Sequence, residues 1–432
     1  MKQHLIVKTA RGVPLLPAPH WQDVIADKAF AREMFLPAVD QLLRQRHTPV
    51  WVTREYRPAG GQWSPAEYAQ GLERVYRLVL QRDKQLPADL VQAISLLPEV
   101  EYARAGRVAV APLPTPSARA FSTTTDRESR EAIFLPEAHR WSRGHAGVTV
   151  AVLDTGVNLS HPELRGTLLP GYDFVDILSG ADEFLGDALD ADPDPSDEVG
   201  HGSHVAGIIA GRGHNMPVGV APLCRILPVR VLGTLRQGDQ RVGAGFLDNI
   251  NHALKTVVDE YQVDVINASF GLKREGSGLP HREVVEYALA RGVTIIAASG
   301  NDGQEALYYP GALPGVIAVG AAAADGEKAP FSTFGPQVTL MAPGIEIYSA
   351  YRDNGYAYAS GTSQAAPFVS GAAALLHSYA LERTGRRLSD GQIKHLLKHT
   401  ADRHNNQWRT RETGYGQINV ADALRLLDYR LG

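Results

Sequence analysis

The sequence Gly147-Val148-Thr149-Val150-Ala151-Val152-Leu153-Asp154-Thr155-Gly156 is an apolar, β-branched run that ends at a carboxylate. Residues 148–153 predict a buried strand, because β-branched side chains favour extended backbone. Asp154 follows the strand directly, at the carboxyl edge of a sheet, where the sites of α/β proteins form. Asp-Thr-Gly is also good turn chemistry, so this segment alone fits either a site residue or a plain turn.

Similar apolar runs recur along the chain from residue 147 onward. Further strands are expected at 225–231, 263–268, 293–298 and 316–319, with helices between them at 203–210, 247–261 and 282–290. This alternation predicts an α/β fold with a doubly wound, mostly parallel sheet. Two more helices are expected near the carboxyl end, at 371–384 and 389–400, and the second begins with a Ser-x-x-Gln capping box.

The first 112 residues predict a separate, small α+β domain. Strands are expected at 4–8, 49–56, 100–102 and 107–111, and helices at 30–45 and 86–97. Ser64-Pro65-Ala66-Glu67 combines an N-cap, a proline at the first helical position and a capping-box glutamate, and we expect its helix to run to about Leu80. Residues 113–135 are rich in proline, serine and threonine and are expected to be a linker. Residues 136–432 then form the larger domain.

Composition excludes several classes of protein. The 432 residues carry a formal net charge of −4 and no dense basic run, so no nucleic-acid partner is expected. The single cysteine, Cys224, rules out an intrachain disulfide framework. No stretch is long and apolar enough for a membrane span. The amino terminus has only a three-residue apolar stretch, which predicts a cytoplasmic protein, or a secreted one whose signal was removed.

Three more polar segments could carry chemistry. His201-Gly202-Ser203-His204 offers a side chain that exchanges a proton near neutral pH, although an isolated surface histidine is the simpler interpretation. Gly361-Thr362-Ser363 opens a helix of small residues, and helix amino termini favour a developing oxyanion; a capped core helix fits equally. Asn301 follows an apolar strand and could donate to such an oxyanion or simply occupy a turn.

Together these segments, in the order Asp, His, Asn, Ser, resemble the signature blocks of the subtilisin-like serine proteases. The similarity extends over about 136–427 and includes 219–222, 265–271, 309–311, 331–332, 341–344 and 414–420. It implies a serine endopeptidase that hydrolyses peptide bonds through an acyl-enzyme intermediate. In that mechanism Ser363 is the nucleophile, His201 the general base, Asp154 the carboxylate that orients it, and Asn301 an oxyanion donor.

The resemblance also implies how substrate binds. Ser269, Phe270 and Gly271 match the edge strand that pairs with an extended peptide, and residues 243–245 match a facing strand. Ala298, Ser299 and Gly300 match one wall of the pocket for the residue before the scissile bond. Tyr308 is expected to make that pocket shallow.

Metal binding is left open by the sequence. The chemistry implies no cofactor, and a structural calcium ion is the only metal that the resemblance suggests. The loop 211–218 is short beside the calcium loop common in the family, and Glu163 replaces its usual aspartate. An acidic insertion follows Asp173 and could bind calcium or be a solvated loop; its carboxylates are Asp182, Glu183, Asp187, Asp190, Asp192, Asp194, Asp197 and Glu198.

The amino-terminal domain resembles, in size and element order, the prodomain that inhibits proteases of this family. On that interpretation it is an intramolecular inhibitor, and the chain cuts itself within 117–125. The alternative is an adaptor domain that is never removed. Two rivals to hydrolysis are a peptide acyl transferase or macrocyclase of the same family, which would need a helical insertion over the site, and a non-catalytic peptide-binding module, which would not need an intact set of catalytic side chains.

Overall fold

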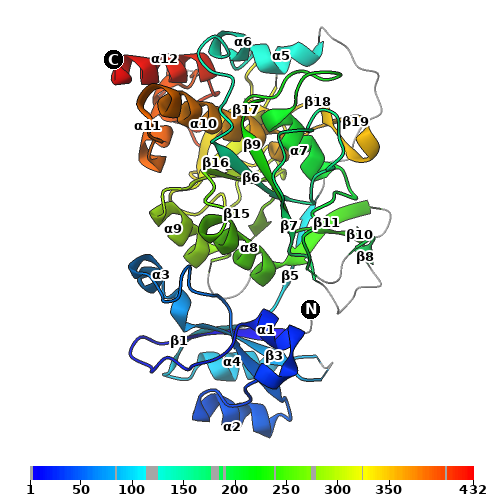
Figure 1. The fold of residues 1–432 in the computed structure, drawn as a ribbon, viewed down its shortest axis with the longest axis vertical. Coiled ribbons are helices and arrows are strands. Elements are labelled where there is room, and N and C mark those ends of the chain that lie inside the picture. Colours follow the sequence, from blue (N-terminus) through cyan, green and yellow to red (C-terminus); the bar gives the residue numbers. More distant parts are fainter. Residues whose placement is uncertain are drawn as a thin grey trace.

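The computed structural model describes residues 3–82, 85–112, 125–176, 184–187, 191–237, 240–273, 279–323, 325–403 and 406–432. An antiparallel region near the amino terminus and a larger α/β unit make up the fold (Figure 1). Among the described residues, no helix combines the length and apolar character needed to cross a bilayer.

The amino-terminal region is a four-stranded antiparallel sheet with helices. Its strand order is β2 (Val50–Arg54), β3 (Val75–Leu80), β1 (His4–Thr9) and β4 (Val100–Ala105). Helices α2 (Pro37–Gln45) and α4 (Ala88–Ser95) lie together beyond one face of this sheet, and α1 (Trp21–Ala26) and α3 (Pro65–Gln70) precede β2 and β3 (Figure 1). Side chains alternate along β1: Leu5 and Val7 join the core of this region, whereas Ile6 joins a core shared with the larger unit.

One expected helix is much shorter than predicted. The capping box of Ser64 and Glu67 is present, but the helix ends at Gln70, where Gly71 adopts a left-handed conformation with φ of 67°. Residues 75–80, which were expected to continue the helix, form β3 and pair with both β1 and β2. Glycine ends the helix because it takes this conformation without a steric penalty, and the Val-Tyr-Arg-Leu-Val-Leu sequence then favours a strand.

The larger unit is built on a seven-stranded parallel sheet, as the sequence predicts. Its order is β17 (Val338–Pro343), β16 (Ile317–Ala322), β14 (Thr294–Ala298), β12 (Val265–Ala268), β6 (Thr149–Asp154), β9 (Arg225–Arg230) and β7 (Tyr172–Asp173). Side chains of β6 alternate between two cores: Val150 and Val152 join the core on one face of the sheet, and Ala151 and Leu153 join the core on the other.

Helices cover both faces of this sheet. They are α7 (His201–Ala210), α8 (Leu247–Asp259), α9 (Arg282–Ala290), α10 (Thr362–Thr384), α11 (Asp390–Thr400) and α12 (Val420–Leu431). Helices α8 and α9 lie between the parallel sheet and the amino-terminal region (Figure 1). The predicted Ser389-x-x-Gln392 capping box opens α11. Helix α10 begins at Thr362, as the segment Gly361-Thr362-Ser363 predicts, and it runs without a break through the helix expected at 371–384, so Ser363 lies in its first turn.

Short strands line the edges of the larger unit. β5 (Val108–Pro112) pairs antiparallel with β11 (Gln240–Phe246), which continues to β10 (Gly233–Gln237) and β8 (Phe184–Leu185). Two further antiparallel pairs are β13 (Leu272–Lys273) with β15 (Tyr308–Tyr309), and β18 (Ile347–Ala350) with β19 (Tyr356–Ala359).

The range expected to be a linker is described only from Thr125. There, α5 (Thr125–Glu131) and α6 (Leu135–Ala138) pack on the larger unit, and the Ile133 between them is fully buried.

Candidate active site

The carboxyl ends of three neighbouring parallel strands carry most of the residues expected at the site. β14, β12 and β6 are adjacent, and Ala297, Ala268 and Leu153 are in register across them. The residues that follow these strands therefore lie along one edge: Asn301 beyond β14, Ser269 beyond β12 and Asp154 at the end of β6. Three of the sequence-predicted segments thus meet because parallel strands end on the same side.

Asp154 and His201 form a buried pair. Nδ1 of His201 lies 2.6 Å from Oδ1 of Asp154, and their side chains are 5% and 0% exposed. His201 begins helix α7 after Gly200, and a Cβ at Gly202 would overlap the carbonyl oxygen of Gly156, so glycine is needed for the helix to approach this closely. Nε2 of His201 is buried and has no hydrogen-bond partner in the described part of the chain. This nitrogen is therefore available to take a proton.

The two histidines of this segment have different environments. Burial alone would lower the pKa of His201, but the charge and hydrogen bond of Asp154 outweigh it and raise this pKa above the usual value. Burial lowers the pKa of His204 to about 3, and its Nε2 lies 2.9 Å from the carbonyl oxygen of Ile347 and 3.1 Å from that of Ala357. His204 is therefore a neutral structural side chain.

Ser363 lies beside Ser269 and makes no described hydrogen bond with His201. Its Oγ donates to the carbonyl oxygen of Ser269 at 2.8 Å, and Ser269 Oγ donates in return to the carbonyl oxygen of Ser363 at 2.9 Å. Ser363 is 4% exposed in the first turn of α10, where backbone N–H groups have no acceptor within the helix. The structure thus brings Ser363 to the same edge as Asp154 but directs its hydroxyl elsewhere.

Asn301 is exposed and oriented by the residue before Ser363. Its Oδ1 accepts hydrogen bonds from the backbone N–H and the Oγ1 of Thr362, at 2.8 and 3.0 Å. These bonds occupy the carbonyl end of the amide, so the remaining polar group of Asn301 is its NH2 donor. The sequence alone indicated no separate role for Thr362. Its position next to Ser363 was the only sequence signal that it could contact the site.

The expected substrate-binding segments differ in what they offer. Phe270 is 3% exposed and its ring packs in the core beside His281, so only its backbone can meet a substrate. Ser299 is buried and donates through Oγ to the carbonyl oxygen of Thr333. Ala298 ends β14 and is likewise buried.

Tyr308 fills space between the two expected binding segments. A Cβ at Gly300 would overlap the Tyr308 ring, and one at Gly271 would lie 3.0 Å from Tyr308 Cβ. The Tyr308 hydroxyl donates to Oδ1 of Asp302 at 2.7 Å, and the Lys273 ammonium lies 2.5 Å from Oδ2 of Asp302. The ring is therefore held in place at its far end.

The residues at the short loop do not fit a calcium ion. The carboxylate of Glu163, which is fully buried, accepts hydrogen bonds from the backbone N–H groups of Gly213, His214 and Asn215 at 2.7, 3.0 and 2.6 Å. A loop that directs N–H donors inward binds an anion and repels a cation. Among the described residues, no group of three or more His, Cys, Asp or Glu side chains could hold a metal ion; Asp182, Glu183 and Asp190 of the acidic insertion lie outside them.

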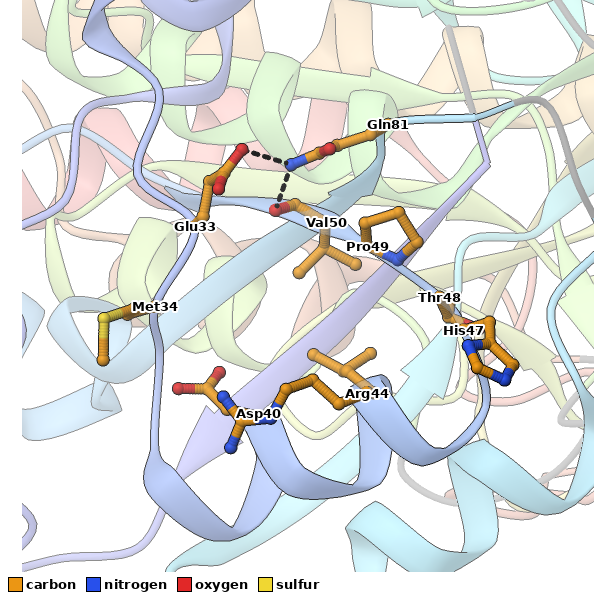
Figure 2. Close-up of a pocket in the computed structure, with 10 residues that line it drawn as sticks. Glu33, Met34, Asp40, Arg44, His47, Thr48, Pro49, Val50 and Gln81 are labelled. Atoms are coloured by element: carbon orange, nitrogen blue, oxygen red, sulfur yellow. Dashed lines mark hydrogen bonds between the residues drawn. The ribbon is translucent and has the colours of Figure 1, made fainter.

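A separate pocket of about 410 Å³ lies in the amino-terminal region. Figure 2 shows it between α2 and the start of β2, with Gln81 donating to Glu33 and to the carbonyl oxygen of Val50. Its lining includes Met34 and Arg44 but none of the residues expected at the active site.

Comparison with known proteins shows the family of the chain. A sequence model described as "Subtilase family" matches residues 145–416, more than half of the chain. A "Thermophilic serine proteinase" of Bacillus sp. (strain AK1) is 38% identical over 289 residues, which are 66% of this chain and 63% of that protein. The "Major intracellular serine protease" of Bacillus subtilis (strain 168) is 37% identical over 276 residues, covering 62% of this chain and 79% of that protein.

A solved structure is similar as well. It is a chain described among the proteases from Pseudoalteromonas arctica PAMC 21717, with a TM-score of 0.59 and 28% identity, over 68% of this chain and 94% of that one.

Proposed function

The chain belongs to the subtilase family of serine peptidases, and from this membership we propose that it cleaves polypeptides with Ser363 as nucleophile, His201 as general base and Asp154 as the orienting carboxylate. The observation that carries this assignment is the buried Asp154–His201 pair, which leaves Nε2 of His201 without a partner in the described structure. The raised pKa of His201 supports the same role, because a carboxylate that raises it also stabilises the imidazolium formed when the base takes a proton.

The first step requires a rotation of the Ser363 hydroxyl and two hydrogen-bond donors for the oxyanion. The Ser363 hydroxyl must turn from the carbonyl oxygen of Ser269 toward Nε2 of His201, which takes its proton as Oγ attacks the scissile carbonyl. The resulting oxyanion would accept hydrogen bonds from the Asn301 amide and the Ser363 N–H. His201 then donates its proton to the leaving amine, and water hydrolyses the acyl-enzyme by the same route. No metal or redox cofactor is needed for these steps.

The experiment that tests this assignment uses a fluorophosphonate and one substitution. The reagent should label Ser363 alone, and Ser363→Ala should lower peptide turnover by about 10⁶-fold, the scale for removal of a triad nucleophile. Labelling of another residue, or full activity in the alanine variant, would refute the assignment.

We also propose that the residue before the scissile bond has a small side chain. Tyr308 occupies the space between Gly271 and Gly300, where a large side chain would otherwise enter. The bonds from Tyr308 to Asp302 and from Asp302 to Lys273 support a fixed rather than a displaceable ring.

The amino-terminal domain, taken as residues 1–112, is proposed to be an intramolecular inhibitor. β5 pairs with residues 242–246 of β11, which include the strand expected to bind substrate, and it lies next to β13, which continues from Gly271. The pairing of β5 with β11 (Figure 1) supports the inhibitor role, because the resemblance assigns residues 243–245 to the binding of extended peptide. The expected cleavage segment, 117–125, lies almost entirely outside the described residues.

Contacts between the amino-terminal region and α8 support a specific docked arrangement. Nε2 of His4 lies 2.8 Å from Oδ2 of Asp248, and Lys255 lies 2.7 Å from Glu67. Arg77 is fully buried, pairs with Glu55 and donates to Oδ1 of Asn249 at 3.3 Å. Buried charges of this kind are stable only when they are paired, which selects one docking geometry.

The inhibitor proposal is tested by comparing the wild type with Ser363→Ala. The wild-type chain should cut itself within 117–125 and the variant should stay intact by mass spectrometry, while residues 1–112 added in trans should inhibit the separated catalytic domain. A fully active, uncut chain without inhibition would favour the adaptor interpretation.

The name of the Bacillus subtilis relative supports the proposed cytoplasmic location, which fractionation of the native cells would test.

A further inference from the structure

Asp197 is a buried carboxylate in the loop before α7, four residues before His201. Asp197 is only 8% exposed. In the sequence it was only one of several carboxylates of the acidic insertion. Carboxylates are rarely buried without a partner that balances their desolvation. The surroundings of Asp197 therefore need an explanation.

Five donors surround the two oxygens of Asp197. Oδ1 accepts from the Oγ1 of Thr155 at 2.9 Å and from the backbone N–H groups of Val199 and Gly200 at 2.9 and 2.8 Å. Oδ2 accepts from the backbone N–H and the Oγ of Ser203, at 2.9 and 2.6 Å. Burial raises the pKa of this carboxyl above its usual value, whereas the hydrogen bonds from Ser203, Gly200 and Val199 lower it. Because every one of the five groups donates, the ionised carboxylate is the form that satisfies them all.

The two hydroxyls connect the segments that carry Asp154 and His201. Thr155, which follows Asp154, donates to Asp197 and accepts from the N–H of Gly202 at 3.0 Å. Ser203 donates to Asp197 and accepts from the N–H of Asn158 at 2.8 Å. These bonds cap the first turn of α7, whose N-cap Gly200 has no side chain to do so. The loop after β6 and the amino end of α7 are thereby joined through one carboxylate.

We propose that Asp197 is a positioning residue for the reaction: its ionised carboxylate fixes the loop after Asp154 to the first turn of α7 and so holds His201 against Asp154. This inference rests on the proposed function, because it concerns the geometry of the same base. The described hydrogen bonds of Asp197 do not include Ser363, and it acts through Thr155 and Ser203.

The charge of Asp197 also reaches His201. The groups that act on the pKa of His201 are its own burial, which lowers it, and the carboxylates of Asp154 and Asp197, which raise it; His204, one turn further along the helix, is neutral. Removing the negative charge of Asp197 would destabilise the imidazolium and lower the pKa of His201. The neutral base would then persist to lower pH.

The test is the pH profile of kcat/KM for full-length Asp197→Asn beside the wild type. We expect kcat to fall by about 10- to 100-fold, because small displacements of catalytic groups cost this much, and KM to change little. The acid limb of the profile should move to lower pH. Asp194→Asn removes the same charge from an exposed position in the same loop and should leave kcat and the acid limb unchanged.

A second variant separates the geometry from the charge. Thr155→Val removes the hydroxyl between Asp197 and Gly202 but keeps the carboxylate, so kcat should fall without a shift of the acid limb. If Asp197→Asn does not fold, as judged by circular dichroism, this variant alone decides. Wild-type kcat in a folded Asp197→Asn, or in Thr155→Val when the first does not fold, would overturn the inference. Failure of the proposed function is distinguishable, since the wild type would then not be labelled at Ser363.

Discussion

Replacing Tyr308 with glycine should widen the pocket for the residue before the scissile bond. The Tyr308 ring lies against Gly300, and its Cβ faces Gly271, so the substitution empties the space between the two backbone segments. It also removes the hydrogen bond to Asp302, which stays paired with Lys273. The glycines themselves are unchanged, so the pocket walls keep their close approach to a substrate.

The size of the effect follows from the side chain that could enter. Burying a phenylalanine side chain fully is worth about 1.5–3 kcal/mol. At about 1.4 kcal/mol for each factor of ten, the preference for phenylalanine over alanine before the scissile bond should rise about 10- to 100-fold. The change should appear in kcat/KM, because the pocket is filled in both the bound substrate and the transition state.

Peptide anilides that differ only in the residue before the cleaved bond measure this ratio. Leu307→Ala is the matched control, because Leu307 is the neighbouring residue and its side chain is 46% exposed. An unchanged ratio in a folded, active Tyr308→Gly enzyme would refute the placement of Tyr308 in the pocket. A wild type that already prefers phenylalanine would refute the small-residue specificity.

Three further outcomes can be measured. Asn301→Ala should lower kcat by about 10²- to 10³-fold with little change in KM, as expected for a donor needed only by the oxyanion; a loss confined to KM would contradict this role. Burial lowers the pKa of His252 on α8 to about 3, and its ring lies 5.1 Å from the ring of His20 in the amino-terminal region. Docking therefore requires a neutral His252, so it should be strongest above about pH 6.5, the pKa of a free histidine, and should weaken as the pH falls below that value. Calorimetry of residues 1–112 with a Ser363→Ala catalytic domain should give about 30-fold weaker binding at pH 5 than at pH 7.5, and equal affinities would exclude this linkage. Glu163→Gln should reduce the free energy of unfolding by about 1–3 kcal/mol, whereas a chelator should leave the wild-type melting temperature unchanged.

Local patterns predicted the parallel sheet because each strand carries its own signal. β6, β9, β12, β14 and β16 are short, mostly apolar runs bounded by turns, and α9 has the predicted bounds. The strand Val75–Leu80 was wrongly predicted as helix, because both of its faces are buried and the alternation that identifies a strand is lost. The helix opening at Ser363 and the helix at 371–384 were expected separately but form the single helix α10, because small residues and Pro367 obscure a helix that packs on all sides.

For the site, too, the positions of single segments could be predicted from the sequence, whereas contacts between distant segments could not. Each predicted segment follows its strand or opens its helix, so its position at the sheet edge could be foreseen. The bond between Thr155 and Asp197 joins residues 42 positions apart, and the pairs of β5 with β11 join residues 130 or more positions apart, so spacing along the chain held no signal for either contact. The inward turn of Phe270 also depends on the core beneath it.

For the proposed inhibitor role, the alternation along β1 has a consequence for what happens to the amino-terminal region after release. Ile6 shares its core with the larger unit, together with Tyr56, Leu72 and Val75 of the same region. If the proposed cleavage released the region, these side chains would meet water, and the sheet would keep only the core on its helical face. A sheet with one bare apolar face opens more often, and an opened chain is a substrate for a peptidase. Activation would then run in one direction, since each inhibitor released is degraded by the enzyme it had restrained.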